Sequence, residues 1–147
     1  MDVHSLERFI PMHALMYSRA LGEIKSGKKR THWMWYIFPC LRSLGKSRNS
    51  YIYGIESLDE AREYLEHEIL GEHLVEISKA LLALDTQCPQ EIFSEIDTFK
   101  LASCATLFLL VDREETSVFS AILDKFFEGK ADTLTLERLG AQLPEKE

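Results

Sequence analysis

The sequence predicts an all-α protein that forms a single compact multihelical domain of about seven or eight helices. Apolar residues recur every three or four positions along most of the chain, which is the spacing of one helix face. Residues that cap helix N-termini precede several of these segments. The chain has 147 residues, the size of one domain, without a linker, repeat or low-complexity tract. We expect residues 1–140 to form the helical domain and residues 141–147 to form a frayed C-terminal tail.

The N-terminal third predicts one amphipathic helix and one buried helix. Residues 6–24 carry the helical spacing, and Pro11 opens or kinks this helix because proline lacks an amide hydrogen. Residues 32–44 are apolar on nearly all sides, which predicts a buried helix broken near Pro39. The polar residues 45–53 predict a loop.

The middle of the chain predicts three further helices with recognisable ends. Ser57 begins a capping box, with a glutamate three residues later, for a helix that runs to about residue 67. A longer helix is expected over about residues 68–84. Pro89 suits the first turn of a short helix, where its missing amide hydrogen costs nothing.

The C-terminal third contains the most apolar segment. Asp97 is expected to cap residues 98–111, which form a central helix or end in a buried strand, and their length favours a helix. Residues 117–127 predict an amphipathic helix, and residues 132–139 predict a short last one.

Cysteine usage and hydropathy exclude several classes of protein. The three cysteines, Cys40, Cys88 and Cys104, are odd in number and lie outside any zinc-binding spacing, which predicts free thiols in the cytoplasm and no metal site. No apolar stretch is long enough for a membrane span, and no signal peptide is recognised, so we expect no membrane association. The sequence also lacks a glycine-rich phosphate loop and a dinucleotide fingerprint, and we expect no cofactor.

Charge is distributed unevenly along the chain, although the net charge is −7. Residues 24–55 contain no acidic side chain and seven basic ones, whereas the rest of the chain carries 10 basic and 24 acidic side chains. A basic island on an acidic protein indicates an anionic partner that is met locally. Extended nucleic acid is an unlikely partner, because the acidic remainder would repel a long polyanion.

The most informative motif begins with three cations that run directly into a histidine and four aromatic residues. Lys29 and Arg30 are suited to neutralise a phosphate or carboxylate, and His32 to donate a hydrogen bond or act as acid or base. Trp33 or Trp35 could stack on the organic part of such a ligand. The alternative is that the aromatic rings fill the core and that the histidine is structural.

A second polar set interrupts the apolar segment near the C-terminus. Lys100 and Ser103 share one helix face, and a lysine in such a segment needs a partner or a route to water. Asp97, at a spacing of three, would form a structural ion pair with Lys100. The functional alternative is that Lys100 is a second cation aimed at the same anion.

For two other sets of reactive side chains we favour an interpretation without a functional role. Cys104 has no visible activating group, so we interpret it as a buried inert thiol. His67 and His73 lie six residues apart, which is the wrong spacing for one helix face, and we expect both to be solvated.

Five blocks of the sequence resemble a widespread family of small all-helical proteins catalogued as a domain of unknown function, some members of which are mislabelled calpastatin. The blocks are residues 27–45, 53–61, 100–108, 117–119 and 136–140. The resemblance implies an all-helical fold and draws attention to Arg42 and Tyr53 within these blocks, but it implies no reaction. Cys40 departs from the polar residue, such as glutamine, that is common in the family.

We expect the first and third blocks, with or without that of Tyr53, to meet at one cleft and to bind a small anionic ligand such as a nucleotide or phosphorylated metabolite. One alternative is an enzyme that acts on such a ligand with His32 as acid or base. Another is a protein-interaction domain that docks an acidic partner through its basic and aromatic face. The candidate ligand-binding residues are Lys29, Arg30, His32, Trp33, Trp35, Arg42, Tyr53, Lys100 and Ser103.

Overall fold

The computed structural model describes residues 2–112, 114 and 116–141, and within these ranges every regular element is a helix. The predicted all-α fold is therefore confirmed. Of the expected frayed tail, residues 142–147 lie outside the described part of the chain. No helix among the described residues is long and apolar enough to cross a bilayer. The α-helices are α1 (Ile10–Lys25), α2 (Met34–Ile37), α3 (Arg48–Tyr53), α4 (Leu58–Glu66), α5 (Leu70–Leu82), α6 (Glu95–Val111), α7 (Val118–Phe126) and α8 (Thr133–Leu139).

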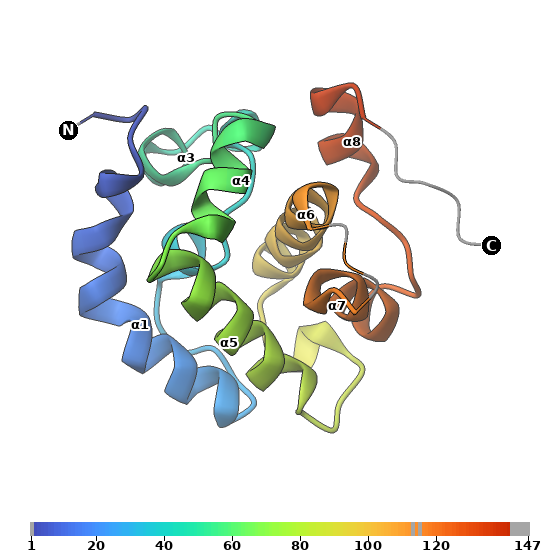
Figure 1. Ribbon diagram of the computed structural model, residues 1–147. Coiled ribbons are helices and arrows are strands. Elements are labelled where there is room, and N and C mark those ends of the chain that lie inside the picture. The colour runs from blue at the N-terminus through green and yellow to red at the C-terminus, as the bar shows by residue number, and fades with distance from the viewer. Residues whose placement is uncertain (1, 113, 115, 142–147) are drawn as a thin grey trace.

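Helix α6 lies at the centre of the fold (Figure 1). It contacts α4 on one side and α7 and α8 on the other, while α1 packs on the far side of α5 (Figure 1). Such a position explains why the stretch from Leu101 to Phe108 is buried on every side, since helices surround it there, whereas the first turns of α6 reach the surface. The expected cap was wrong by three residues: Ser94 accepts the amide of Asp97 at 3.1 Å, so Asp97 lies inside the first turn.

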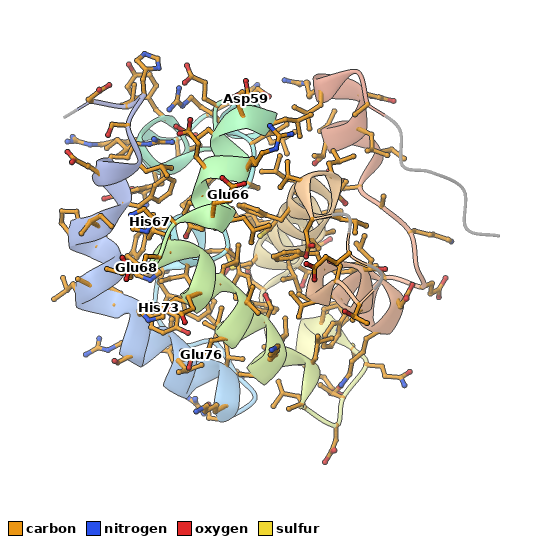
Figure 2. The ribbon with its side chains drawn as sticks, in the orientation of Figure 1. Asp59, Glu66, His67, Glu68, His73 and Glu76 are labelled. Atoms are coloured by element: carbon orange, nitrogen blue, oxygen red, sulfur yellow. The ribbon has the colours of Figure 1, made fainter. Side chains whose placement is uncertain are left out.

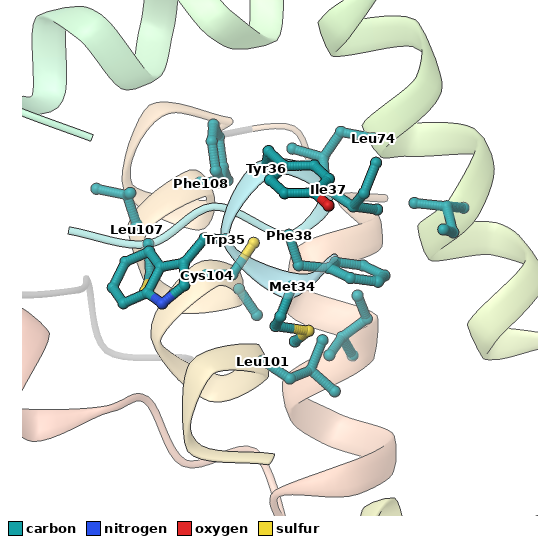
Figure 3. Packing of buried hydrophobic residues seen from close by; sticks show 14 of the residues in the cluster. Met34, Trp35, Tyr36, Ile37, Phe38, Leu74, Leu101, Cys104, Leu107 and Phe108 are labelled. Carbon is teal, nitrogen blue, oxygen red and sulfur yellow. The ribbon is translucent and has the colours of Figure 1, made fainter. Parts of the chain in front are cut away.

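The predicted buried helix over residues 32–44 is much shorter than expected. Only α2, a single turn, is α-helical, and a 3-10 turn follows at Arg42–Leu44. Pro39 explains the early end, since the residue before a proline avoids the helical region. The burial was predicted correctly, because the segment from Trp33 to Leu41 passes through the core. Figure 3 shows its side chains against those of Leu101, Cys104, Leu107 and Phe108 from α6.

Hydrogen bonds to a distant loop satisfy the backbone where this buried segment leaves the core. Ile55 donates its amide to the carbonyl of Cys40 at 2.8 Å, and Arg42 donates its amide to the carbonyl of Ile55 at 2.9 Å. They form an isolated parallel bridge between Leu41 and Ile55. A buried amide or carbonyl without a partner is costly, so this short bridge fixes the path of both loops.

The loop predicted over residues 45–53 contains a helix instead. Ser47 caps α3 by accepting the amide of Ser50 at 3.1 Å. The polar composition concealed this short helix, whose inner face is only Ser50 and Tyr53. The remaining predicted helices are confirmed, with ends within a few residues of those expected and with Ser57, Ser117 and Asp132 as caps.

A buried ion pair joins the N-terminal segment to α4. Arg8 and Glu60 meet through two contacts, Nη2 to Oε1 at 2.5 Å and Nη1 to Oε2 at 3.0 Å. Their side chains are almost completely buried. Arg8 also donates to the carbonyls of Ser5, Ile52 and Gly54. The guanidinium group therefore ties the chain start, the end of α3 and the following loop to one carboxylate.

A column of stacked rings joins α1 to α5 and corrects the expectation for His73. Its ring stacks on Tyr17, with the centroids 4.0 Å apart, and its Nδ1 lies 2.9 Å from Nε2 of buried His13. Tyr17 also donates to the Glu76 carboxylate at 2.6 Å. Figure 2 shows His73 and Glu76 following His67 along this edge of the fold. We expected His73 to be solvated because no sequence pattern indicates that α1 packs against it.

The buried ion pair predicts a large loss of stability when one partner is removed. Arg8→Met leaves the Glu60 carboxylate buried and uncompensated, which costs roughly 3–5 kcal/mol of unfolding free energy. Urea unfolding of Arg8→Met, of Glu60→Met and of the double variant measures these losses of unfolding free energy. We expect the double variant to lose less than the sum of the single losses. The exposed pair of Arg62 and Asp59 provides the control: Arg62→Met should cost less than about 1 kcal/mol. An equal loss in Arg8→Met and Arg62→Met would contradict the argument.

The His13 ring predicts a weakening of the fold in mild acid. Burial, with help from the neighbouring imidazoles of His73 and His67, lowers the pKa of His13 from 6.5 to about 4. As the pH falls from 6.5 towards 4, His13 binds a proton in the unfolded chain but not in the folded chain, so the unfolding free energy decreases. His13→Phe keeps an aromatic ring without a titrating group. It should flatten the pH dependence of urea unfolding between pH 6.5 and about pH 4, whereas His4→Gln at an exposed position should not. An unchanged slope in His13→Phe would assign the acid sensitivity to other groups.

Candidate functional site

The first and third sequence blocks meet at the carboxylate of Asp97. Lys29 Nζ lies 2.8 Å from Asp97 Oδ2, and Lys100 Nζ lies 3.4 Å from Asp97 Oδ1. The ion pair predicted between Lys100 and Asp97 is thereby confirmed. Lys29 comes from the loop after α1, and its amide donates to the carbonyl of Ile92 just before α6. Two ammonium groups from distant segments thus share one carboxylate, which leaves a net positive charge.

Each lysine also lies over the face of a tryptophan. Lys29 Nζ is 5.0 Å from the centroid of the Trp33 ring, and Lys100 Nζ is 5.2 Å from that of Trp35. A cation at this distance is attracted by the negative face of the ring. The tryptophans therefore act first as supports that position the ammonium groups. Trp33 is 1% exposed, so its ring offers a ligand almost no surface in this arrangement.

Glu23, at the end of α1, holds the basic loop in place. Its carboxylate accepts four hydrogen bonds, from the amides of Arg30 and Thr31, the Thr31 hydroxyl and the Trp33 indole. Burial alone would raise the pKa of Glu23, but these hydrogen bonds outweigh it and lower the pKa to about 2. The sequence carried no sign of this role, because no spacing rule links an acid to donors seven to ten residues later.

Two adjacent hollows share Trp35 and Lys100 as a common wall. The small pocket has a volume of about 110 Å³, and its lining includes two lysines, Lys29 and Lys100, together with His32. The large pocket has a volume of about 300 Å³ and a mixed lining. The small pocket is also lined by Trp33, Met34, Tyr36, Asn49 and Asp97. The large pocket is also lined by Cys40, Leu44, Gly45, Ser47, Ile96, Ser103, Asp132 and Leu134.

Asp132 lines the large pocket together with Lys100 and was missed as a site residue. Its Oδ2 caps α8 by accepting the amide and hydroxyl of Thr135, and it lies 3.1 Å from the Ser103 hydroxyl. Its amide donates to Thr106 Oγ1 at 2.8 Å. The sequence indicated Asp132 as the start of a helix. Only the packing of α8 on α6 reveals that this cap faces Ser103.

Three of the predicted site residues lie away from these pockets. Arg30 is exposed and donates to the Ser26 hydroxyl and the Lys28 carbonyl. Arg42 reaches the N-terminal segment, where Nη2 donates to the carbonyl of Val3 at 2.5 Å. Tyr53 is buried and packs edge-on against Tyr36. The structure thus brings together Lys29, His32, Trp33, Trp35, Lys100 and Ser103, and separates Arg30, Arg42 and Tyr53 from them.

The buried cysteines are unsuited to act as nucleophiles. Burial raises the pKa of Cys40 to about 12, with a lowering contribution from Lys100 and a raising one from Asp132. Burial also raises the pKa of Cys104 well above its usual value, in agreement with its interpretation as an inert thiol. Both thiols therefore stay protonated at neutral pH, and Cys40 contributes a neutral wall to the large pocket.

A larger hollow lies elsewhere and has the opposite charge. This open groove of about 1040 Å³ follows the junction of α4 and α5 and is lined by six carboxylate or histidine side chains, of which Glu72, His73 and Glu76 lie on α5. Figure 2 shows Glu66, His67, Glu68, His73 and Glu76 along it. Its acidic lining would repel an anion, so chemistry rather than size selects the two smaller pockets.

The Glu23 hydrogen bonds predict that the basic loop loosens when this carboxylate is neutralised. Glu23→Gln removes the charge and one acceptor, which should cost about 1–3 kcal/mol and speed amide hydrogen exchange at Arg30 and Thr31. Because the folded pKa is lowered, the stabilisation is present above about pH 4.5 and is lost as the pH falls towards 2. Glu23→Gln should abolish this part of the pH dependence. Glu72→Gln, on the exposed face of α5, is the matched control, and equal exchange rates in both variants would contradict the role of Glu23.

Comparison with known proteins agrees with this fold and supplies no activity. Residues 3–139 match the family described as "Protein of unknown function (DUF1810)". The crystal structure of the conserved hypothetical protein Rv1873 from Mycobacterium tuberculosis is similar, with 38% sequence identity and a TM-score of 0.89. The match covers 96% of this chain and 100% of that one. No curated protein matches the chain. Since the family match spans nearly the whole chain, the protein belongs to the DUF1810 family.

Proposed function

We propose that this protein is a binding module for a small anionic ligand, such as a nucleotide or phosphorylated metabolite, which binds at the two pockets that share Lys100. The observation that carries the proposal is the pair of ammonium groups around the single carboxylate of Asp97. Each ammonium has three donors, and one carboxylate cannot occupy all six. The remaining hydrogens are available to a phosphate or carboxylate.

The roles of the lining residues follow from their exposure and contacts. Lys100 is the more accessible of the two lysines and lines both pockets, so it would bind the anion directly. Lys29 would act mainly through its charge, since its side chain is 8% exposed. His32 is exposed at the small pocket and would add a donor. Ser103 would contact the part of the ligand in the large pocket, while Arg30 would raise the local positive potential from outside.

A second candidate function is a protein-interaction domain for an acidic partner. It is favoured by three large apolar side chains that lie exposed beside the pockets: Ile96 at 68%, Phe99 at 65% and Leu134 at 43%. Exposed apolar groups beside cations are typical of binding surfaces. The enzyme alternative has less support, because among the described residues no hydrogen bond or ion pair joins the His32 side chain to a carboxylate. We infer a cytoplasmic setting from the three free thiols.

A thermal-shift screen with Lys100→Met tests the proposal. The panel contains mononucleotides, dinucleotides, sugar phosphates and polyphosphate. A ligand at about 100 times its Kd adds about 2.7 kcal/mol to the unfolding free energy, which raises the Tm by a few degrees at this size. We expect Lys100→Met to lose the shift, because it removes the accessible cation. Lys79→Met, in the acidic groove, is the matched control and should keep it.

Two outcomes of this screen would contradict ligand binding at the pockets. A shift of equal size in the wild type and in Lys100→Met would place the anion elsewhere. The absence of any shift across the panel would favour the interaction domain. In that case a pull-down should recover an acidic protein with the wild type and lose it when Phe99 is changed to serine.

A further inference from the structure

The two pockets differ in chemistry, and together they describe a ligand with two unlike ends. The small pocket contains the cationic groups Lys29 and Lys100 with His32, and its volume of about 110 Å³ accommodates little more than a compact anionic group. The large pocket has apolar walls and ends at the carboxylate of Asp132. The small pocket keeps a net positive charge because two lysines flank Asp97, whereas in the large pocket Asp132 offsets Lys100, so charge favours the small pocket for an anion.

Asp132 specifies a hydrogen-bond donor at the far end of the ligand. Oδ2 receives the hydrogen bonds of Thr135 and lies near the Ser103 hydroxyl. Oδ1, in contrast, takes no hydrogen bond from the described part of the chain. An ionised carboxylate only accepts, so a ligand group that fills the pocket must offer it an N–H or O–H.

The walls between these two ends fit a flat, partly apolar body. The lining of the large pocket includes the ring of Trp35, which also lines the small pocket, and the apolar side chains of Ile96 and Leu134. Ile96 and Leu134 keep 68% and 43% of their surface exposed, so a ring between them would cover apolar area that now faces water. The volume of about 300 Å³ lies at the lower end of the range for small-molecule sites and is suited to one ring system with its sugar.

We infer that the ligand is a nucleoside monophosphate, with its phosphate in the small pocket and its base in the large pocket, where an N–H or O–H donates to Asp132. This inference rests on the proposed function and narrows it. Dinucleotides and larger cofactors exceed the two pockets, inorganic phosphate lacks the body, and a free nucleoside lacks the charge. Lys100 contacts both parts because it stands between the pockets.

Titration calorimetry with four probes separates this inference from the proposed function. The probes are adenosine 5′-monophosphate, adenosine, ribose 5-phosphate and inorganic phosphate. We expect the monophosphate to bind at least about tenfold more tightly than ribose 5-phosphate, which corresponds to one added charged hydrogen bond and the covered apolar area. Lys100→Met should weaken the binding of both the monophosphate and ribose 5-phosphate. Adenosine alone should bind weakly or not at all.

Asp132→Asn isolates the contact at the far end. Asparagine still caps α8 through its side-chain oxygen but presents its amide NH2 group, a donor, at the position of Oδ1, which the inference makes an acceptor. This variant should weaken the binding of the monophosphate about tenfold and leave the affinity for ribose 5-phosphate unchanged. Asp85→Asn, at an exposed position, is the control and should change neither.

Each result decides one of the two claims. If ribose 5-phosphate and the monophosphate bind equally well and both depend on Lys100, the inference is overturned and anion binding stands. If the monophosphate is unaffected by Asp132→Asn, its base lies elsewhere and the inference is likewise overturned. If adenosine binds as tightly as its monophosphate, the anion contributes nothing at these pockets and both claims fail. If none of the four probes binds, the inference is overturned, and the wider thermal-shift panel decides the proposed function.

Discussion

The fold depends on one constraint, which is that a segment of irregular backbone crosses the core. The chain from Trp33 to Leu41 is buried throughout, yet only one helical turn satisfies its peptide groups. Buried amides and carbonyls need partners, so the segment must find them outside itself. It does so through the bridge to Ile55, while the Tyr36 hydroxyl ties the segment to the preceding loop by donating to the carbonyl of His32. The helices therefore enclose this crossing, with α6 against its apolar side chains (Figure 3).

The same crossing explains why cations gather where they do. The loop before it must remain close to the start of α6, because the amide of Lys29 donates to Ile92 just ahead of that helix. Asp97, in the first turn of α6, is thereby brought beneath the ammonium group of Lys29. A carboxylate in the first turn also interacts favourably with the helix dipole. The clustering of Lys29 and Lys100 around Asp97 is thus a consequence of how the core is closed.

The sequence predicted those features that depend on local chemistry and missed those that depend on distance. Helix α4 was predicted from Ser57 and helix α7 from its apolar spacing, and both are confirmed. The pair of Lys100 with Asp97 was predicted because three residues separate the two on one helix. The roles of Glu23 and Asp132 were not predicted, because tertiary packing brings their hydrogen-bond partners to them. Helix α3 was not predicted, because its inner face is too short to show helical periodicity. The role of each candidate in binding remains a prediction.

Asp97 gives the site an energetic property that a bare cluster of lysines would lack. Without it, two ammonium groups would repel each other within the folded chain, and the free protein would lose stability. With it, the empty site is stable, but a ligand must compete with an internal carboxylate for the ammonium hydrogens. A weakly charged ligand would gain little from that exchange. A phosphate monoester, with close to two negative charges and three acceptor oxygens, would gain more from it, so under the proposed function Asp97 would favour such ligands over simple carboxylates.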